Sequence, residues 1–418
     1  MTSRFCLALF YVSCSFSFPF TSALPSSAQT YRVVYAFNGE DGLQAGSILV
    51  SDKAGNLYGA STYGGGASSC VNAPCGAIYK INPAGDETTL YEFKGPPDGQ
   101  NPIGLTVGAS GVLYGVTQYG GTSTFSYCGT GCGTVFELSS QGEAVLHSFE
   151  APPSDGIVPQ TSVTIASNGT MYGTTTYGGT NMAFGNPGEG TIYSVVNGNE
   201  SVLYNFTGGD DGGLPSAGLL ERNGALYGTA EFGGDGPCIT VLGNGCGTVF
   251  KVSASGETTL WSFQDGPDGA DPAANLIADK KGNLYGTTVL GGDVSCNLSR
   301  GNPPGCGVVF KLSPSGDETV LHTFTDSQDG AWPSDALVRD DAGNLYGTAF
   351  YGGDLNCNGT GCGTVFKIDA SGNFTVVHTF EGSDGAYPRA PIAVGGKLYG
   401  VTNGGGPASL GVVFEIAP

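Results

Sequence analysis

The sequence predicts an all-β fold, a seven-bladed β-propeller of four-stranded antiparallel blades, and three observations predict it. The tripeptide Leu-Tyr-Gly, once written Met-Tyr-Gly, recurs seven times, beginning at positions 57, 113, 171, 226, 284, 345 and 398. The steps between copies are 56, 58, 55, 58, 61 and 53 residues, and a period in the fifties with strand-like units is typical of a propeller. Glycine supplies 73 of 418 residues while hydrophobic residues stay at 39%, so the glycines fall in turns between strands and do not mark disorder.

Each copy contains the same four elements in the same order. The first is a short apolar strand, such as ANLIAD at 274–279, which ends in a tight turn containing Gly. The second is the LYGT strand, followed by a Gly-Gly pair and a loop of variable length. The third opens with Gly and reads GTVFKV at 247–252, and after another Gly turn the fourth reads TVLHTF at 319–324. Four consecutive strands of this kind form one antiparallel blade.

The two ends of the chain complete each other. The last copy stops at GVVFEIAP, residues 411–418, after its third strand. Residues 31–37, YRVVYAF, read as a fourth strand that no third strand precedes. Pairing the two would close the ring and leave no blade with an open edge. We therefore expect residues 29–418 to form a single propeller domain.

Residues 1–28 have the pattern of a secretory signal peptide, with one Arg, an apolar run and small residues before a predicted cleavage after Ala28. Lipidation of Cys14 is a weaker alternative, because Leu does not stand three residues before it. No later run of eighteen apolar residues is present. We expect a secreted protein, extracellular or periplasmic, that inserts into no membrane.

Ten cysteines remain after the signal peptide, and they fall into five close pairs. The pairs are Cys70 with Cys75, Cys128 with Cys132, Cys238 with Cys246, Cys296 with Cys306, and Cys357 with Cys362. In an exported chain such pairs indicate disulfides, each of which would hold its loop to the start of a third strand. Zinc is the competing interpretation, but no pair has a second pair or a histidine at ligand spacing.

These motifs also match a known family. The combination of GNLYGTT, Gly-Gly, GTVFKV, TVLHTF and Asp-Gly followed by Pro resembles the Gloeo/Verruco (GloVer) tandem repeat of secreted and surface-anchored bacterial proteins. The resemblance covers essentially the whole chain after the signal peptide. It implies no established activity. Members often carry a C-terminal anchoring segment, and because this chain ends inside its last blade we expect free secretion.

Charge and histidine content argue against several functions. The net charge of −21 repels nucleic acid and anionic lipid, and we expect neither as a partner. The three histidines, His147, His322 and His378, occupy one position of the fourth strand where other copies carry Tyr or Trp, which indicates packing. With no histidine outside this position, a Ser-His-Asp triad or a histidine zinc site has few residues from which it could form. No nucleotide-binding motif is present. We expect a monomer without a cofactor, calcium being the one exception considered.

An Asp-Gly pair follows every fourth strand. The seven aspartates are Asp41, Asp98, Asp155, Asp211, Asp268, Asp329 and Asp384. The stronger interpretation is structural: Asp caps a turn, Gly supplies positive φ, and the Pro that follows in six copies stiffens the entry to the next blade. The alternative is a ring of carboxylates around the central funnel that holds Ca²⁺, with Asp211 and Asp268 as candidates because they lie in acidic clusters.

Loops after the second and fourth strands emerge on one side of the ring, where binding residues are expected. Residues that break the repeat there are Glu231, Trp332, Arg389 and Arg300. A second set consists of aromatic residues before the Gly-Gly pairs, namely Tyr63, Tyr119, Tyr177, Phe232 and Tyr351. Such rings stack on sugars, or they pack over the blade edges.

The sequence thus favours a binding module on the loop side, with extracellular polysaccharide or a cell-surface component as its partner. The first alternative is an enzyme on polysaccharide, either a glycosidase with two carboxylates or a lyase with a base and a cation. The second is a structural or adhesive surface protein. Enzymatic activity is left open, and the repeated positions report on folding alone.

Overall fold

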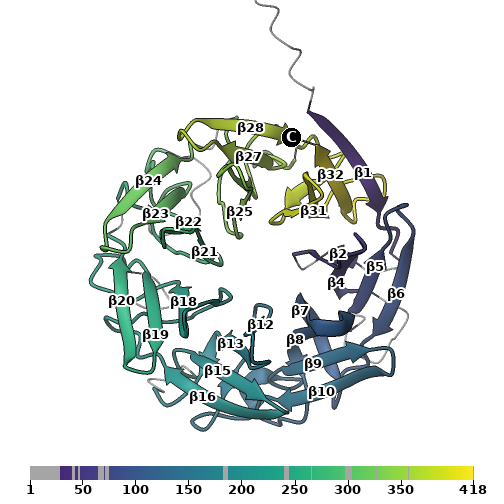
Figure 1. Ribbon diagram of the computed structural model, residues 1–418, viewed down its shortest axis with the longest axis vertical. Helices are drawn as coiled ribbons and strands as arrows, with labels where there is room; N and C mark the ends of the chain where they lie inside the picture. Colours follow the sequence, from purple (N-terminus) through teal and green to yellow (C-terminus); the bar gives the residue numbers. More distant parts are fainter. Residues whose placement is uncertain are drawn as a thin grey trace, which may run out of the picture.

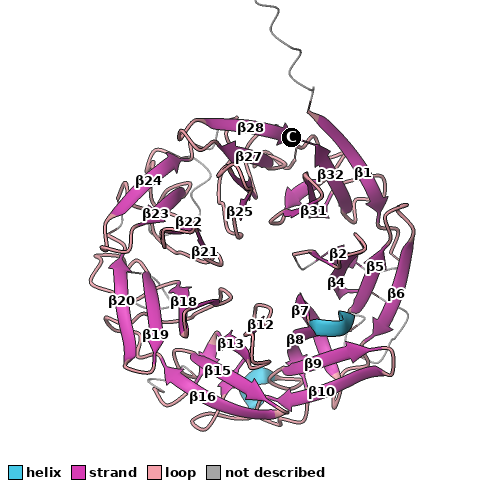
Figure 2. Ribbon diagram, in the orientation of Figure 1, coloured by secondary structure: helices cyan, strands magenta, loops and turns pink. Residues whose placement is uncertain are grey.

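The computed structural model describes residues 29–39, 43–45, 48–64, 70, 75–181, 187–239, 244–264, 266–296, 304–325, 328–355 and 357–417. The predicted signal peptide with Cys14, and also Asp41 and Arg300, lie outside these residues. The strands form a ring of seven blades around a central opening, which confirms the predicted fold (Figure 1). Two short 3-10 turns, Ala109–Gly111 and Ser126–Cys128, are the only helices in the described part of the chain (Figure 2).

In blades one to six the strands run outward from the centre in chain order. Blade one contains β2 (Leu43–Ala45), β3 (Val50–Ser51), β4 (Leu57–Tyr63), β5 (Ala77–Ile81) and β6 (Glu87–Glu92). Blade two contains β7 (Gly99–Val107), β8 (Leu113–Gly120), β9 (Thr134–Ser139) and β10 (Gly142–Ser148). Blade three contains β11 (Gly156–Ile157), β12 (Thr164–Ile165), β13 (Met171–Thr175), β14 (Tyr177–Gly178), β15 (Thr191–Val196) and β16 (Asn199–Asn205).

Blades four to seven follow the same plan. Blade four contains β17 (Leu220–Arg222), β18 (Ala225–Ala230), β19 (Thr248–Ser253) and β20 (Gly256–Ser262). Blade five contains β21 (Ile277–Ala278), β22 (Leu284–Thr288), β23 (Val308–Leu312) and β24 (Glu318–Thr323). Blade six contains β25 (Val338–Arg339), β26 (Leu345–Ala349), β27 (Thr364–Ile368) and β28 (Phe374–Thr379). Blade seven contains β29 (Ala386–Pro388), β30 (Ile392–Val394), β31 (Lys397–Gly404) and β32 (Val412–Ala417), with β1 (Thr30–Ala36) at its edge.

The first strand closes the ring as predicted. β1 pairs antiparallel with β32, from Thr30 opposite Ala417 to Ala36 opposite Val412, and Figure 1 shows the two side by side. The hydroxyl of Tyr31 also donates to the main-chain oxygen of Asp384 at 2.6 Å. Both ends of the described chain are therefore held in one blade.

The glycine of the LYG motif is explained by packing between strands. It lies under the aromatic ring of the GTVF strand, and a Cβ on Gly286 would come within 2.6 Å of Cζ of Phe310. Phe310 in turn meets Phe263 of the preceding blade, with ring centroids 5.3 Å apart in a T-shaped arrangement. Both phenylalanines are fully buried. The repeated motif therefore joins each blade to the one before it.

All five predicted cysteine pairs are disulfides in the structure, with Cα atoms between 4.9 and 5.7 Å apart. Each second cysteine directly precedes the glycine before a third strand. The bridges therefore fix the Gly-Gly loops to the blades, as the spacing predicts. No helix among the described residues is long and apolar enough to cross a membrane.

One backbone feature was not predicted. The residue before the Pro that follows each Asp-Gly pair has a positive φ between 52° and 61° in six copies, namely Asn101, Val158, Leu214, Asp271, Trp332 and Tyr387. Its N–H donates to a carbonyl of the preceding blade, as from Asp271 to Cys246 at 2.9 Å. Left-handed backbone costs about 1 to 2 kcal/mol for such residues. The inter-blade hydrogen bond offsets part of this cost.

Candidate functional site

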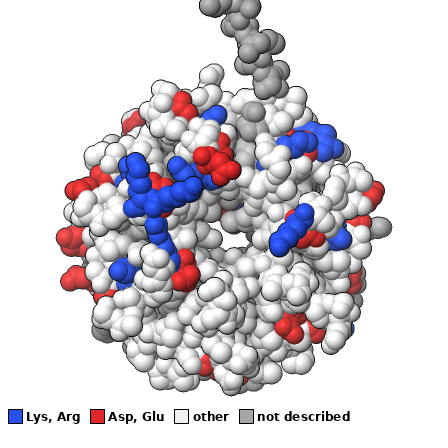
Figure 3. Space-filling model, viewed as in Figure 1, with Lys and Arg blue, Asp and Glu red and all other residues white. Residues whose placement is uncertain are grey.

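A cavity of about 400 Å³ lies at the centre of the ring and is lined by residues from all seven blades. In the space-filling view the opening at the centre of the molecule remains visible (Figure 3). Its charged and polar lining includes Gln160, Thr161, Ser216, Glu231, Asn275, Asp335 and Arg389. Two of the residues that break the repeat, Glu231 and Arg389, thus lie in one central cavity. Sequence reasoning predicted both but did not predict that they share it.

Arg389 brings a positive charge into the central cavity. It follows the short strand β29, and its Nη2 lies 3.5 Å from Oδ1 of Asp335. Burial raises the pKa of the Asp335 carboxyl, and the charge of Arg389 opposes that effect. Nε of Arg389 has no hydrogen-bond partner among the described residues. The guanidinium is therefore held by Asp335 at one nitrogen, while its Nε is buried without a partner.

Glu231 faces a second carboxyl, Asp271 of the next blade. Burial, together with a smaller contribution from the charge of Glu231, raises the pKa of Asp271 to about 8. Burial also raises the pKa of Glu231, against a hydrogen bond from Ser216 that lowers it. At neutral pH the pair therefore retains a proton. Asp271 was not identified as a candidate from the sequence. The one feature that could have identified it is an acidic residue before the repeated Pro, where other copies carry Asn, Val, Leu, Trp or Tyr.

A first aromatic cluster consists of Tyr63, Tyr119, Tyr127 and Tyr177. The rings of Tyr127 and Tyr177 are 5.7 Å apart in a T-shaped arrangement. Burial raises the pKa of Tyr119, and Tyr63 and Tyr127 raise it further. Tyr127 is 50% exposed and Tyr63 is 36% exposed. Three predicted aromatic residues thus lie together, while Tyr127 was missed because it stands in a disulfide loop outside any repeated position.

A second aromatic cluster consists of Trp332, Phe350, Tyr351 and Tyr387. Ring centroids of Trp332 and Tyr351 are 5.1 Å apart, and Phe350 stacks on Tyr387 at 5.3 Å. Tyr351 also meets Tyr387 at 5.7 Å. Trp332 and Tyr351 were predicted, and the structure brings them together. Phe232, by contrast, is only 3% exposed and packs inside the protein, which agrees with the packing interpretation of these aromatic residues.

The aspartates of the Asp-Gly pairs lie between blades and bind main-chain and side-chain donors. Oδ2 of Asp211 accepts hydrogen bonds from the Tyr204 hydroxyl at 2.8 Å and from the Thr207 N–H at 2.9 Å. Asp268 accepts from the Gln264 N–H at 3.0 Å. Neither carboxylate is among the residues that line the central cavity. These contacts agree with the structural interpretation, and calcium at Asp211 or Asp268 stays a prediction.

Positive side chains form several groups on the face drawn in Figure 3, although the net charge is −21. On the face drawn in Figure 3, Lys and Arg side chains gather over the region of blade five. There Arg222 donates to the main-chain oxygen of Asp279 at 2.9 Å, next to the exposed Lys280 and Lys281. Figure 3 also shows acidic side chains between these cations.

Comparison with known proteins identifies the repeat. The profile of the Gloeobacter/Verrucomicrobia repeat family matches residues 20–242, 125–295 and 243–418. No curated protein matches the chain.

Several solved structures are similar in fold. A gluconolactonase from Xanthomonas campestris is 11% identical, with 93% of this chain and 90% of that one covered and a TM-score of 0.46. A PQQ-bound aldose sugar dehydrogenase from Streptomyces coelicolor is 12% identical, with 94% and 99% covered and a TM-score of 0.45. The extracellular domain of a protein assigned as a hybrid two-component system of B. thetaiotaomicron is 13% identical, with 92% and 42% covered and a TM-score of 0.53. Of these three, the last has a TM-score above 0.5, and at 13% identity that similarity shows the propeller fold alone.

Proposed function

We propose that this chain, which belongs to the Gloeobacter/Verrucomicrobia repeat family, is a secreted binding module that recognises carbohydrate on the loop side of its propeller. Five disulfides support export, because such bridges persist in oxidising compartments. The loop side carries the Gly-Gly loops and both aromatic clusters. The partner is an extracellular polysaccharide or a glycan on a cell surface.

The observation that carries the proposal is the pairing of aromatic clusters with a polar central cavity. Aromatic faces bind the C–H faces of sugar rings, and Tyr and Trp keep a polar group in water while they do so. The cavity adds hydrogen-bond donors and acceptors at Ser216, Asn275 and Arg389. Pockets that combine apolar faces with a few polar groups are typical of small-molecule sites. A glycan chain bound across both aromatic clusters would place one of its sugar units above the central cavity.

Affinity electrophoresis tests this function. Residues 29–418 are run through native gels cast with plant, algal and microbial polysaccharides, and binding retards the band. Tyr119→Ala and Tyr351→Ala should each reduce retardation without lowering the melting temperature. Tyr58→Ala is the matched control, because its hydroxyl contacts Asp52 in the turn after β3 and not a rim residue. Unchanged mobility in every gel would reject carbohydrate binding and leave the adhesive or structural role.

Catalysis is the second candidate, and the Glu231–Asp271 pair favours it. Glycoside hydrolysis needs one protonated and one ionised carboxyl. A pair that retains a proton at neutral pH supplies both, and Glu231 lines the central cavity. If the protein is such an enzyme, it clears the polymer behind its band, and Glu231→Gln and Asp271→Asn abolish the clearing while retardation remains. Clearing that survives in both variants would reject these residues as the catalytic pair.

A further inference from the structure

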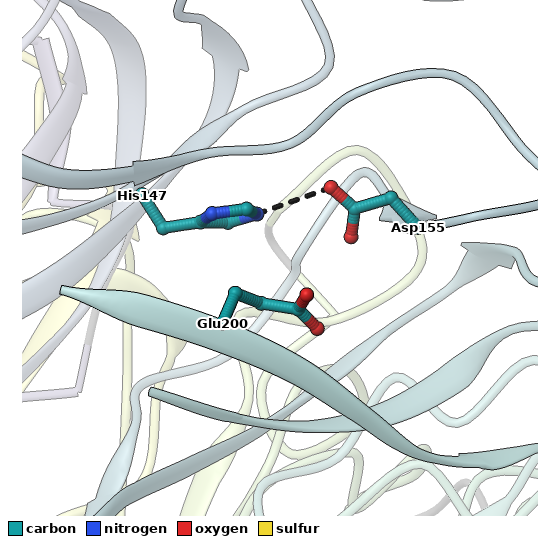
Figure 4. Close-up of side chains that lie close together, drawn as sticks. All are labelled: His147, Asp155 and Glu200. Carbon is teal, nitrogen blue, oxygen red and sulfur yellow. Dashed lines mark hydrogen bonds and ion pairs between the residues drawn. The ribbon is translucent and has the colours of Figure 1, made fainter. Parts of the chain in front are cut away.

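The interface between blades two and three gathers three side chains with metal-ligating atoms (Figure 4). His147 comes from β10, Asp155 from the connection that follows it, and Glu200 from β16 of the next blade. One ligating atom of each residue lies within 4.8 Å of the other two. Nε2 of His147 is 3.1 Å from Oδ2 of Asp155, and these two side chains are 16% and 7% exposed. All three therefore converge on one small volume.

Two buried oxygen atoms near this volume lack hydrogen-bond partners among the described residues. One is Oε1 of Glu200 itself, and the equivalent atoms of Glu143 and Glu318 lack partners at two other interfaces. The other is the hydroxyl of Tyr193, a residue that is 0% exposed. Burial and the charges of Glu200 and Asp155 raise the pKa of Tyr193, so its hydroxyl lies within electrostatic reach of both carboxylates. Buried oxygens without partners are costly unless a proton donor or a cation satisfies them.

The other interfaces show how this one differs. Where a Glu faces the Asp-Gly aspartate, the remaining position carries Tyr or Trp, as in Tyr91 with Asp98 and Glu143, Tyr204 with Asp211 and Glu257, and Trp261 with Asp268 and Glu318. Where it carries His, an aromatic ring replaces the Glu: His322 stacks on Phe374 at 3.5 Å and His378 on Tyr31 at 3.9 Å. Among the described residues, His, Asp and Glu meet only between blades two and three.

Tyr193 differs from the residue that most copies carry at its position in the third strand. Blade one also has Tyr there, Tyr79, and the five other copies have Phe, namely Phe136, Phe250, Phe310, Phe366 and Phe414. A phenylalanine would fill the same space beneath the LYG glycine without a polar atom. The hydroxyl therefore adds an oxygen to the interface that already holds His147, Asp155 and Glu200.

We propose that His147, Asp155 and Glu200 bind a divalent transition-metal ion, best matched by zinc, that links blade two to blade three. Zinc binds imidazole nitrogen at about 2.0 to 2.1 Å and carboxylate oxygen at about 2.0 to 2.2 Å. Two such ligands in a tetrahedral site lie about 3.3 Å apart. The 3.1 Å between Nε2 and Oδ2 is close to this spacing, and a rotation of Glu200 completes a third ligand.

The mixed ligand set selects the ion. Imidazole suits zinc and neighbouring transition metals, whereas calcium and magnesium prefer oxygen alone. Three protein ligands leave a fourth position for water. The site does not line the central cavity. Its role is to hold two outer strands together, independently of any glycan bound at the rim.

The expectation that the histidines only pack is therefore amended for one of the three. His322 and His378 retain the packing role, with an aromatic ring against each imidazole. In place of such a ring, His147 has the carboxylate of Glu200 on the next blade.

The test is metal binding by chelator-treated protein, residues 29–418, followed by calorimetric titration with Zn²⁺ and by the visible absorption of Co²⁺. The structure predicts one ion per chain, Co²⁺ bands that indicate nitrogen and oxygen ligands, and a melting temperature several degrees higher in excess Zn²⁺. His147→Tyr should abolish all three effects and still fold, because the outer strands of blades one and three carry Tyr at this position, namely Tyr91 and Tyr204. His322→Tyr is the matched control and should leave them unchanged.

A gain of function gives an independent readout. Tyr204→His places an imidazole beside Asp211 and Glu257, and it should raise the stoichiometry from one ion to two. Failure of the unaltered protein to bind Zn²⁺ or Co²⁺ would overturn the proposal. Binding that persists in His147→Tyr, or that is lost equally in His322→Tyr, would also overturn it, since the ion would then lie elsewhere.

Discussion

Three glutamates at blade interfaces should make this protein less stable as the pH rises from 5 to 8. Glu143, Glu257 and Glu318 each lie half-buried next to an Asp-Gly aspartate of the preceding blade, Asp98, Asp211 and Asp268 respectively. Burial, and then the charge of the aspartate, raises the pKa of each glutamate from 4.5 to about 7. Hydrogen bonds from Tyr91 to Glu143 and from Thr259 to Glu257 lower these two pKa values, in each case by less than burial raises them.

The direction follows from proton uptake on folding. Between pH 4.5 and 7 the folded protein holds protons on these carboxyls that the unfolded chain has released, so the free energy of unfolding falls as the pH rises. A fully buried carboxyl with this rise in pKa would contribute about 3 kcal/mol. Because these side chains are half-exposed and screened by water, we expect about 1 kcal/mol each. The sum, about 3 kcal/mol, corresponds to a fall in melting temperature of about 4 °C.

The assay is thermal unfolding of residues 29–418 between pH 5 and pH 8 at constant ionic strength. The range begins above the region where Glu415 loses its ionised form, since Arg32 and Lys397 lower the pKa of that carboxyl to about 2 and its stabilisation is lost only in acid. The control is the triple variant Glu143→Gln, Glu257→Gln and Glu318→Gln, which mimics the protonated side chains. Its melting temperature should fall less steeply with pH, and Glu200 and Asp271, whose pKa values burial raises to about 7 and about 8, account for the slope that remains. A stability that is constant or rises with pH, or an equal slope in the variant, would refute the reasoning.

Three further predictions concern packing, cross-links and the carboxyl pair. Gly286→Ala should lower the free energy of unfolding by about 1 to 3 kcal/mol in urea, because the new methyl group meets the Phe310 ring, and adding Phe310→Leu should recover part of the loss. Replacing Cys128 and Cys132 together by Ser should cost about 2 kcal/mol by the loop-entropy estimate, and a loss no larger than the error of the urea curves would argue against it. Glu231→Gln should lower the pKa of Asp271 below about 8, as measured by carbon-13 NMR of the carboxyl, and an unmoved value would show that the two side chains do not interact.

The fold could be predicted because the repeat specifies it seven times. The LYG, Gly-Gly and GTVF motifs recur in the same order in every blade. An ambiguous strand assignment in one copy can therefore be resolved from the others. The ring closure by β1 followed from the missing strands at the two ends, and the structure confirms it. The disulfides were predictable because each pair spans one short loop.

The site was less predictable because it depends on contacts between blades. Glu231 was identified as a departure from the repeat, but its neighbour Asp271 lies forty positions later and reaches it through a left-handed backbone that no residue type at that position announces. Phe350 and Tyr387 were missed for the same reason. The histidine position was recognised as one that alternates with Tyr and Trp, but the contact with the Asp-Gly aspartate appears only in three dimensions.

Glycan binding at the aromatic rim is the central claim, and the fluorescence of Trp332 tests it most directly. The chain has two tryptophans, and Trp261→Tyr, which introduces the residue found at that position in other copies, leaves Trp332 as the single tryptophan. Titration of this variant with a polysaccharide that retards the protein should give a saturable change in emission, which Tyr351→Ala weakens. Retardation by the polysaccharide with no change in Trp332 emission would place binding elsewhere and contradict the account.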